Sequence, residues 1–196
     1  LLHKLGTGRA GTVWLAVHIG LEEYRAIKRI SKRDADYDTF RREALVLKEL
    51  RHPGIPMIYD LEEDSEFFYL IEEYLEGYSL YALIVNQGPI QEAEAVRYGM
   101  QVCGLVAYMH SACEIPILHL DLQPNNLIIC NGTVKLIDFD HAAGCRWANT
   151  APKRFGTVGC AAPEQYASDR MLDQRTDIYA IGAVLRFMTA GTLREE

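Results

Sequence analysis

The period of the hydrophobic pattern changes near the middle of the chain, and this change limits the folds that the chain can adopt. Before residue 73 the apolar residues favour one helix at about 38–50 and short strands at 12–17, 24–30, 57–61 and 67–71. From Ser79 onward helical spacing dominates, and a last helix is expected over about 176–190. The expected fold class is α+β, with a small sheet-rich lobe over residues 1–75 and a helical lobe over 76–196.

The helical half also contains a strand pair and a helical face. Residues 127–130 and 133–137 flank Asn131-Gly132, a pair that accepts positive φ and predicts a hairpin turn. One helix is expected to bury residues spaced by three or four positions, namely Val96, Met100, Cys103, Ala107 and His110. Residues 139–175 show little periodicity, and so long a loop inside a compact domain is usually functional.

Composition excludes several classes of function. The net charge of −7 provides no basic field for nucleic acid or for an anionic membrane. Five cysteines without a C-x-x-C pair indicate neither a disulfide framework nor a zinc site. No apolar run approaches the roughly 20 residues that span a bilayer. A cytoplasmic location is expected, either for a free protein or for the cytosolic domain of a longer, membrane-anchored one.

A glycine-rich segment lies near the start of the chain. LGTGRAGTVW, from Leu5 to Trp14, places Gly6, Gly8 and Gly11 in G-x-G-x-x-G spacing, which lets backbone amides approach phosphate oxygens. A dinucleotide-binding fingerprint would open a helix at the third glycine, whereas the residues that follow here favour a strand. The segment is therefore expected to join two strands, either over a nucleotide or as a simple glycine-rich turn.

Polar residues interrupt an apolar run in HLDLQPNNLI, residues 119–128. Asp121, Gln123 and Asn126 stand among leucines where a buried strand would carry apolar residues only. Earlier in the chain, Lys28 lies between apolar strand residues and Glu43 lies at the start of a helix. A lysine at such a place is usually solvated, but a buried ammonium would need an acidic partner such as Glu43.

The ordered set of motifs resembles eukaryotic-like protein kinases. It comprises the glycine-rich segment, Ala26-Ile27-Lys28, FRRE at 40–43, HPGI at 52–55, HLDLQPNNLI, Asp138-Phe139-Asp140, GTVGCAAPEQY at 156–166 and Asp177-Ile178-Tyr179. The resemblance covers essentially the whole chain, and the segments AAPEQY and QPNNL are most similar to those of bacterial serine/threonine kinases. It implies a two-lobed fold with an antiparallel sheet in the first lobe and further helices at the carboxyl end, which this chain is expected to lack. Without those helices, apolar residues between 178 and 188 would be left partly exposed.

The resemblance implies a protein serine/threonine kinase that uses ATP and Mg²⁺ on serine and threonine hydroxyls of proteins. Asp121 would orient the attacking hydroxyl, Asn126 and Asp138 would hold Mg²⁺, and Thr157 would stand beside the catalytic aspartate. Lys28 would contact the phosphates and pair with Glu43. The residues implied around the nucleotide are Leu5, Gly6, Gly8, Gly11, Val13, Ala26, Glu72, Glu73, Leu75 and Ile128. His119, Phe139 and Leu47 would stack in one column, anchored by Asp177.

Four positions depart from the family pattern. Leu120 replaces an arginine that would bind an activating phosphate, and Gln123 replaces the lysine that steadies the transferred phosphoryl group. Asp140 replaces a glycine, which is expected to restrict the backbone beside Asp138 or to add charge near a cation. Glu72 replaces an apolar residue or threonine, and it is expected to be buried and to meet the exocyclic amine of adenine.

Two further expectations concern the segment before the last helix. Glu164 shows no arginine partner of the kind that the family places in a later helix. Thr150 and Thr157 are candidate autophosphorylation sites.

Two alternative functions stay open. The departures at Leu120, Gln123 and Asp140 suit a pseudokinase, which binds nucleotide or a partner without transferring phosphate. Ile137-Asp138-Phe139-Asp140 is also similar to small-molecule phosphotransferases of the aminoglycoside or choline kinase type. GTVGCAAPEQY opposes that second alternative, since this segment serves protein substrates in the family that it resembles.

Overall fold

The computed structural model describes residues 1–8, 11–35, 37–149, 155–167 and 169–193. The chain divides into two compact units, Leu1–Glu76 and Gly77–Glu196, with the boundary one residue from the predicted one. No helix within the described ranges is long and apolar enough to cross a membrane.

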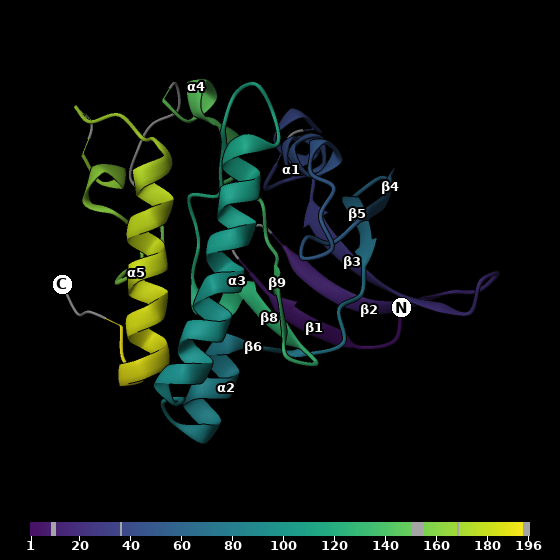
Figure 1. Ribbon diagram of the computed structural model, residues 1–196. Helices are drawn as coiled ribbons and strands as arrows, with labels where there is room; N and C mark the ends of the chain where they lie inside the picture. The colour runs from purple at the N-terminus through teal and green to yellow at the C-terminus, as the bar shows by residue number, and fades with distance from the viewer. Residues whose placement is uncertain (9–10, 36, 150–154, 168, 194–196) are drawn as a thin grey trace. The chain divides into compact units, whose positions relative to one another are not determined.

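The first unit is an antiparallel sheet with a helix packed on it (Figure 1). Its strand order is β1-β2-β3-β5-β4, and the helix α1 (Tyr37–Glu49) contacts β4 and β5. The strands are β1 (Lys4–Thr7), β2 (Thr12–His18), β3 (Glu23–Ser31), β4 (Ile58–Glu63) and β5 (Phe67–Glu73). The four predicted strands and the helix are confirmed. The sequence did not reveal β1, because a four-residue strand containing glycine is too short to show a period.

Aromatic stacking fixes α1 on the sheet. The rings of Phe40 and Phe68 are 4.8 Å apart at their centroids and nearly parallel, at 9°. They belong to a buried cluster that also contains Ile30, Ala44 and Leu70. Glu43, next to Ala44 on this helix, is therefore held in one place relative to β3.

The second unit is mainly helical. The helices α3 (Glu92–Ser111) and α5 (Gln174–Ala190) pack side by side in the teal and yellow part of Figure 1. The other elements are β6 (Tyr78–Ser79), α2 (Leu80–Gln87), β7 (Ile117–Leu118), the 3-10 turns Pro124–Asn126 and Pro163–Gln165, β8 (Leu127–Cys130), β9 (Thr133–Leu136), β10 (Ala143–Gly144) and α4 (Cys145–Ala148). The two-residue strands β6, β7 and β10 and the short helix α4 are too short to show a period in the sequence.

The predicted hairpin is confirmed. Strands β8 and β9 pair from Leu127 opposite Leu136 to Cys130 opposite Thr133. The turn residues Asn131 and Gly132 have φ of 49° and 77°, as a tight hairpin turn requires. The open end of this hairpin carries the motif residues that precede β8 and follow β9.

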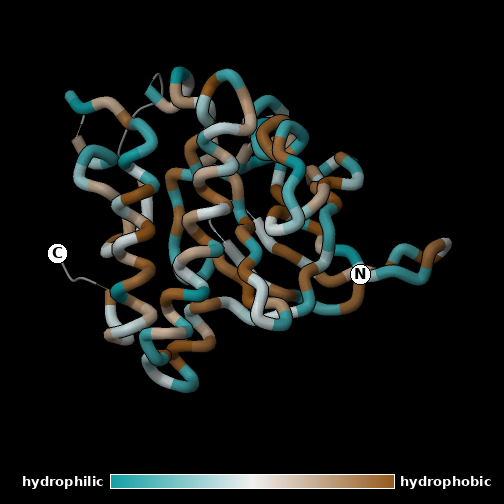
Figure 2. The backbone as a smooth tube through the Cα atoms, in the orientation of Figure 1, coloured by the Kyte–Doolittle hydropathy of each residue, from teal (hydrophilic) through white to brown (hydrophobic). Residues whose placement is uncertain are grey.

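The predicted buried face of α3 is wrong. Val96 and Met100 are 52% and 70% exposed, and Cys103 and Ala107 are also exposed. The buried residues are Ala95, Tyr98, Gly99, Val102, Leu105, Val106 and Met109. Figure 2 shows hydrophobic colour recurring along this helix, so its periodicity alone does not select a face.

A glycine determines how α5 approaches α3. A Cβ atom at Gly99 would lie 2.6 Å from Leu185 Cδ2, so a larger residue would displace that side chain. The sequence predicted that apolar residues between 178 and 188 would be exposed. Ile178 is exposed, whereas Val184 and Phe187 are buried. Packing of α5 therefore buries part of the apolar face that was expected to be exposed.

Candidate active site

In the first unit, Lys28 and Glu43 form a buried ion pair. Lys28 Nζ lies 2.9 Å from Glu43 Oε2, and the two residues are 7% and 4% exposed. Lys28 is on β3, between Val13 on β2 and Leu70 on β5. Desolvating two charges offsets most of the attraction between them, so such a pair adds little net stability. Because the pair adds little stability, its presence favours a role in binding a charged ligand.

The glycine-rich segment joins β1 and β2, as predicted. Gly8 N donates to Gly11 O at 2.9 Å, which closes the turn. A Cβ atom at Gly11 would lie 2.3 Å from Arg29 O, so only glycine fits so close to β3. At Gly6 and Gly8 a Cβ atom would meet no atom within 4 Å in the part of the chain that the structure describes. Backbone there can be approached by a phosphate.

The residues implied around the adenine ring lie on adjacent strands or beside them. Ala26 on β3 stands opposite Glu72 on β5. Glu72 is half-buried, which is less than expected. Glu73 N donates to Met57 O at 2.9 Å, so an adenine contact at Glu73 would use its carbonyl oxygen. Leu75 is half-buried beyond the end of β5.

In the second unit, three side chains donate to the carboxylate of Asp121. Thr157 Oγ1 donates to Oδ1 at 2.8 Å, and Gln123 Nε2 donates to Oδ2 at 3.0 Å. Asn126 Nδ2 donates to the Asp121 carbonyl at 2.9 Å and to Oδ2 at 3.4 Å. The structure thus brings together four of the predicted site residues, and it orients the aspartate before any ligand binds.

The β8–β9 hairpin brings the two candidate metal ligands to one end. Ile137 N donates to Asn126 O at 2.9 Å, which places Asp138 directly after a residue bonded to Asn126. Asp138 has a φ of 63°. Among the described residues, Asp140 is not one with positive φ, so its backbone does not need a glycine. The side chain of Asp140 therefore does not restrict the backbone beside Asp138 as expected. Ile128 is half-buried on β8.

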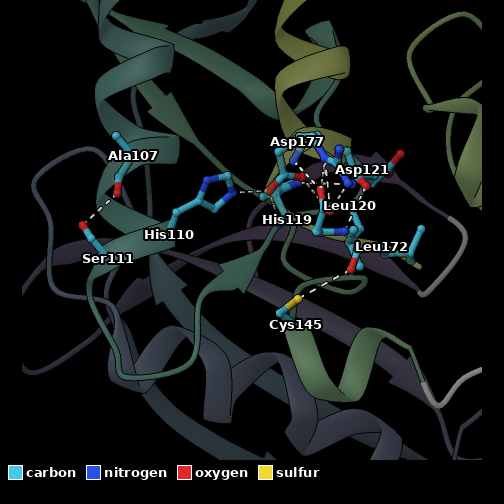
Figure 3. A network of polar contacts seen from close by, with 12 residues as sticks. Ala107, His110, Ser111, His119, Leu120, Asp121, Cys145, Leu172 and Asp177 are labelled. Atoms are coloured by element: carbon cyan, nitrogen blue, oxygen red, sulfur yellow. Dashed lines mark hydrogen bonds and ion pairs between the residues drawn. The ribbon is translucent and has the colours of Figure 1, made fainter. Parts of the chain in front are cut away.

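Asp177, on α5, holds the backbone at the start of residues 119–128, which correspond to the catalytic loop of the family pattern. Its Oδ2 accepts from His119 N at 3.0 Å, and its Oδ1 accepts from Leu120 N at 2.9 Å. Figure 3 shows the ring of His110, from α3, pointing toward this carboxylate, with Nε2 2.8 Å from Oδ2. Sequence analysis placed His110 on a buried face but missed its polar role. A histidine among apolar residues of one helix was the available signal.

His119 is completely buried and neutral. Burial lowers the pKa of its imidazole, against the opposing effect of the Asp177, Asp121 and Asp138 carboxylates. Its Nε2 lies 3.3 Å from Ile137 O, and Asp121 N lies 3.4 Å from its Nδ1. A neutral ring protonated on Nε2 donates to the first and accepts from the second. The ring also meets Phe139 edge to face, at 5.0 Å between centroids.

Leu120 occupies an apolar cluster where the family pattern has arginine. It is 3% exposed and packs with Leu118, Ala148 and Leu172. Asn149 reinforces the cluster, because its Nδ2 donates to Leu172 O at 2.9 Å and its Oδ1 accepts from Leu172 N at 2.7 Å. A side chain that bonds both backbone groups of one residue acts like a strand pair. No periodic signal in the sequence indicated Asn149.

Glu164 has a partner that the sequence did not reveal. Thr176 Oγ1, in the first turn of α5, donates to Glu164 Oε1 at 2.9 Å. The expectation concerned an arginine partner only, and this contact with a hydroxyl does not contradict it. Thr150, one of the candidate autophosphorylation sites, lies outside the described residues.

Comparison with known families supports the identification that these site residues suggest. Residues 1–194 match the model of the protein kinase domain. The chain belongs to the protein kinase domain family. The expected fold, with an antiparallel sheet in one lobe and helices in the other, is that of this family.

Several named kinases are similar to this protein kinase domain. It is 32% identical to the putative sperm motility kinase W of Mus musculus over 192 residues, covering 97% of this chain and 38% of that protein. It is 33% identical to the serine/threonine-protein kinase PrkC of Bacillus subtilis over 201 residues, covering 98% and 30%. It is 32% identical to calcium-dependent protein kinase 5 of Plasmodium falciparum over 194 residues, covering 96% and 33%. The chain thus spans about a third of the length of these relatives, which come from varied organisms.

The apolar cluster around Leu120 predicts a strong effect of an arginine at this position. Leu120→Arg would bury a guanidinium among apolar side chains and lower the free energy of unfolding by about 3 kcal/mol or more. The similar-sized Leu120→Met is the matched control and should cost less than about 1.5 kcal/mol. Urea unfolding measures both. Equal stability of the two variants would show that residue 120 does not pack in this cluster.

The lowered pKa of His119 predicts a pH-dependent stability. Below about pH 6.5, His119 is protonated in the unfolded chain but stays neutral in the folded one, because burial lowers the pKa of the native ring. The free energy of unfolding therefore decreases as the pH falls toward the lowered native pKa. One such proton contributes a slope of up to about 1.4 kcal/mol per pH unit. Urea unfolding of the parent and of His119→Phe from pH 7.5 to 5.5 should show a shallower slope in the variant. Identical slopes would contradict the prediction.

Proposed function

We propose that this protein is a serine/threonine protein kinase, which transfers the γ-phosphoryl group of ATP to serine and threonine hydroxyls of proteins. The observation that carries the proposal is the orientation of the Asp121 carboxylate by Thr157, Gln123 and Asn126. A general base must be held within reach of the hydroxyl proton that it takes. The names of the relatives, which include serine/threonine kinases, also support the proposal.

Asp121 would orient the acceptor hydroxyl and receive its proton. The hydroxyl oxygen forms a bond to the γ-phosphorus, the bond from that phosphorus to the bridging oxygen of ADP breaks, and ADP leaves with the electron pair. Thr157 and Gln123 hold the carboxylate still, so its rotation need not be restricted during the reaction.

The donor set at the end of the β8–β9 hairpin suits Mg²⁺. Asn126 uses its Nδ2 for Asp121, which leaves the amide oxygen for a metal, and Asp138 contributes a carboxylate. Oxygen atoms of these two kinds are the ligands that Mg²⁺ prefers. When bound, the ion would neutralise charge on the phosphates.

Residues of the first unit would hold the nucleotide. Lys28, kept in place by Glu43, would contact the phosphates, and the backbone at Gly6 and Gly8 would approach them. Leu5, Val13 and Ala26 would contact the adenine side. The backbones of Glu73 and Leu75 would form hydrogen bonds with the polar edge of adenine. The side chain of Glu72 would contact the exocyclic amine of adenine.

The proposed partners are proteins that carry accessible serine or threonine side chains. The net charge of −7 does not favour nucleic acid as a partner. The proposed location is cytoplasmic, where ATP is available, for a free protein or for a domain of a longer one.

A nucleotide-binding pseudokinase is the second candidate. One observation favours it: the group 3.0 Å from Asp121 Oδ2 is the neutral amide of Gln123, where the family pattern has a lysine. A neutral donor stabilises developing charge less than an ammonium does. The oriented Asp121 and the buried Lys28–Glu43 pair favour the active kinase. A small-molecule phosphotransferase is less favoured, because Thr157 lies in a segment typical of kinases that act on proteins.

Asp121→Asn should strongly reduce phosphoryl transfer and leave nucleotide binding intact. The amide cannot accept the hydroxyl proton, but it keeps the shape of the side chain, and a loss of at least about a hundredfold in kcat is expected. Transfer of label from ATP to a generic protein substrate with Mg²⁺ measures activity, and a thermal shift with ATP measures binding. A nucleotide-dependent shift without transfer in the parent would favour the pseudokinase.

Gln123→Lys should raise turnover if the parent is an active kinase. An ammonium restores a positive charge at this position, and an increase in kcat of about tenfold is expected from one charge-assisted contact. Gln123→Met, which has a similar length and no donor, is the control and should lower kcat. Equal kcat values for the parent and both variants would show that Gln123 does not contribute to phosphoryl transfer.

A further inference from the structure

The buried side chain of Gln165 links two segments that the mechanism uses. Gln165 is 1% exposed in the 3-10 turn Pro163–Gln165. Its Nε2 donates to Leu120 O at 2.7 Å and to Phe155 O at 3.3 Å. Its Oε1 accepts from Ala162 N at 2.9 Å. One amide therefore joins the catalytic loop, the segment before Thr157 and the turn that carries Gln165 itself.

The two carbonyl groups held by Gln165 flank the hydrogen bond between Asp121 and Thr157. Leu120 directly precedes Asp121, and Phe155 stands two residues before Thr157. Thr157 Oγ1 and Asp121 Oδ1 are 2.8 Å apart. The side-chain bond and the Gln165 amide together close a ring, so a shift of either carbonyl would move one end of that bond.

The backbone between Phe155 and Thr157 is shaped around this amide. Gly156 has a φ of 125°, a conformation that other residues rarely adopt. A Cβ atom there would lie 3.0 Å from Gln165 Nε2 and 2.5 Å from Ala161 Cβ. Gly156 thus makes room for Gln165, and this close approach is independent of the hydrogen bonds.

The catalytic loop is strained at the point where Gln165 holds it. Leu120 has a φ of 67°, which costs energy for a leucine and persists only where surrounding contacts enforce it. Asp177 Oδ1 accepts from its N–H group, and Gln165 Nε2 donates to its carbonyl oxygen. Two buried side chains from different elements therefore fix the residue that precedes Asp121.

We propose that Gln165 is a positioning residue for phosphoryl transfer, which sets the Asp121–Thr157 contact by holding the Leu120 and Phe155 carbonyl groups. This inference rests on the proposed kinase function. Gln165 does not touch the reacting atoms. Its loss should impair transfer to the protein substrate and leave ATP binding unchanged, because the residues proposed to bind the phosphates lie elsewhere.

The test compares Gln165→Met with the parent. Methionine keeps the length of the side chain and removes all three hydrogen bonds. The matched control is Gln174→Met, which makes the same change at an exposed glutamine at the start of α5. If Gln165→Met does not fold, Gln165→Asn replaces it, since this neutral amide is one methylene shorter and no longer reaches the two carbonyl groups.

Two measurements are made on each protein. In the kinase assay, kcat/KM for the protein substrate should fall by roughly tenfold to a hundredfold in the Gln165 variant, with KM for ATP within about twofold of the parent. Amide hydrogen exchange without substrate should accelerate at residues 119–123 and 155–162 and stay unchanged in α3. Gln174→Met should match the parent in both.

The outcomes separate this inference from the proposed function. Unchanged kcat/KM, an equal loss of ATP affinity, or exchange that accelerates over the whole second unit would overturn the positioning role. If the parent itself transfers no phosphate, the proposed function fails. The exchange pattern then decides alone: acceleration confined to the two segments supports Gln165 as the link between them, and any other pattern overturns it.

Discussion

The arrangement of the catalytic loop depends on one buried carboxylate, that of Asp177. It is 1% exposed, and both of its oxygens accept backbone hydrogen bonds, from His119 N and Leu120 N. Its place in the first turn of α5 favours a negative charge, because the N-terminal end of a helix carries partial positive charge. His110 supplies a further contact from α3. A single side chain thus ties the loop to both main helices of the second unit.

The geometry of Asp121 follows from this anchor. Leu120 adopts a left-handed conformation that costs roughly 1–2 kcal/mol. A hydrogen bond to a charged group contributes about 1.5–3 kcal/mol, so the bond from Leu120 N to Asp177 can offset that strain. Packing of Leu120 against Ala148 and Leu172 adds to the anchor. The strained residue turns the chain so that the next carboxylate meets Thr157 and Gln123.

Neutral groups do much of the positioning around Asp121. Gln123 and Thr157 donate to its carboxylate, and the buried ring of His119 is held neutral by desolvation. Neutral donors can be buried at lower cost than charges, provided that their hydrogen bonds are made. In the first unit the opposite holds, because Lys28 and Glu43 are both charged and buried. That cost is consistent with a site that binds an anion.

The order and spacing of its motifs indicated the family of this protein and the candidate site residues, and the period of its apolar residues predicted most of the strands and long helices. These features are local: Asn131-Gly132 predicts its own turn, and strands β2, β3 and β5 show their apolar residues directly. Only the tertiary structure decided which face of α3 is buried, because that helix is apolar on more than one side and the approach of α5 at Gly99 selects among them. Likewise, His110, Asn149, Gln165 and Thr176 acquire their partners from segments distant in sequence. Hydrogen bonds of that kind leave no periodic pattern, so they depend on packing that a sequence does not display.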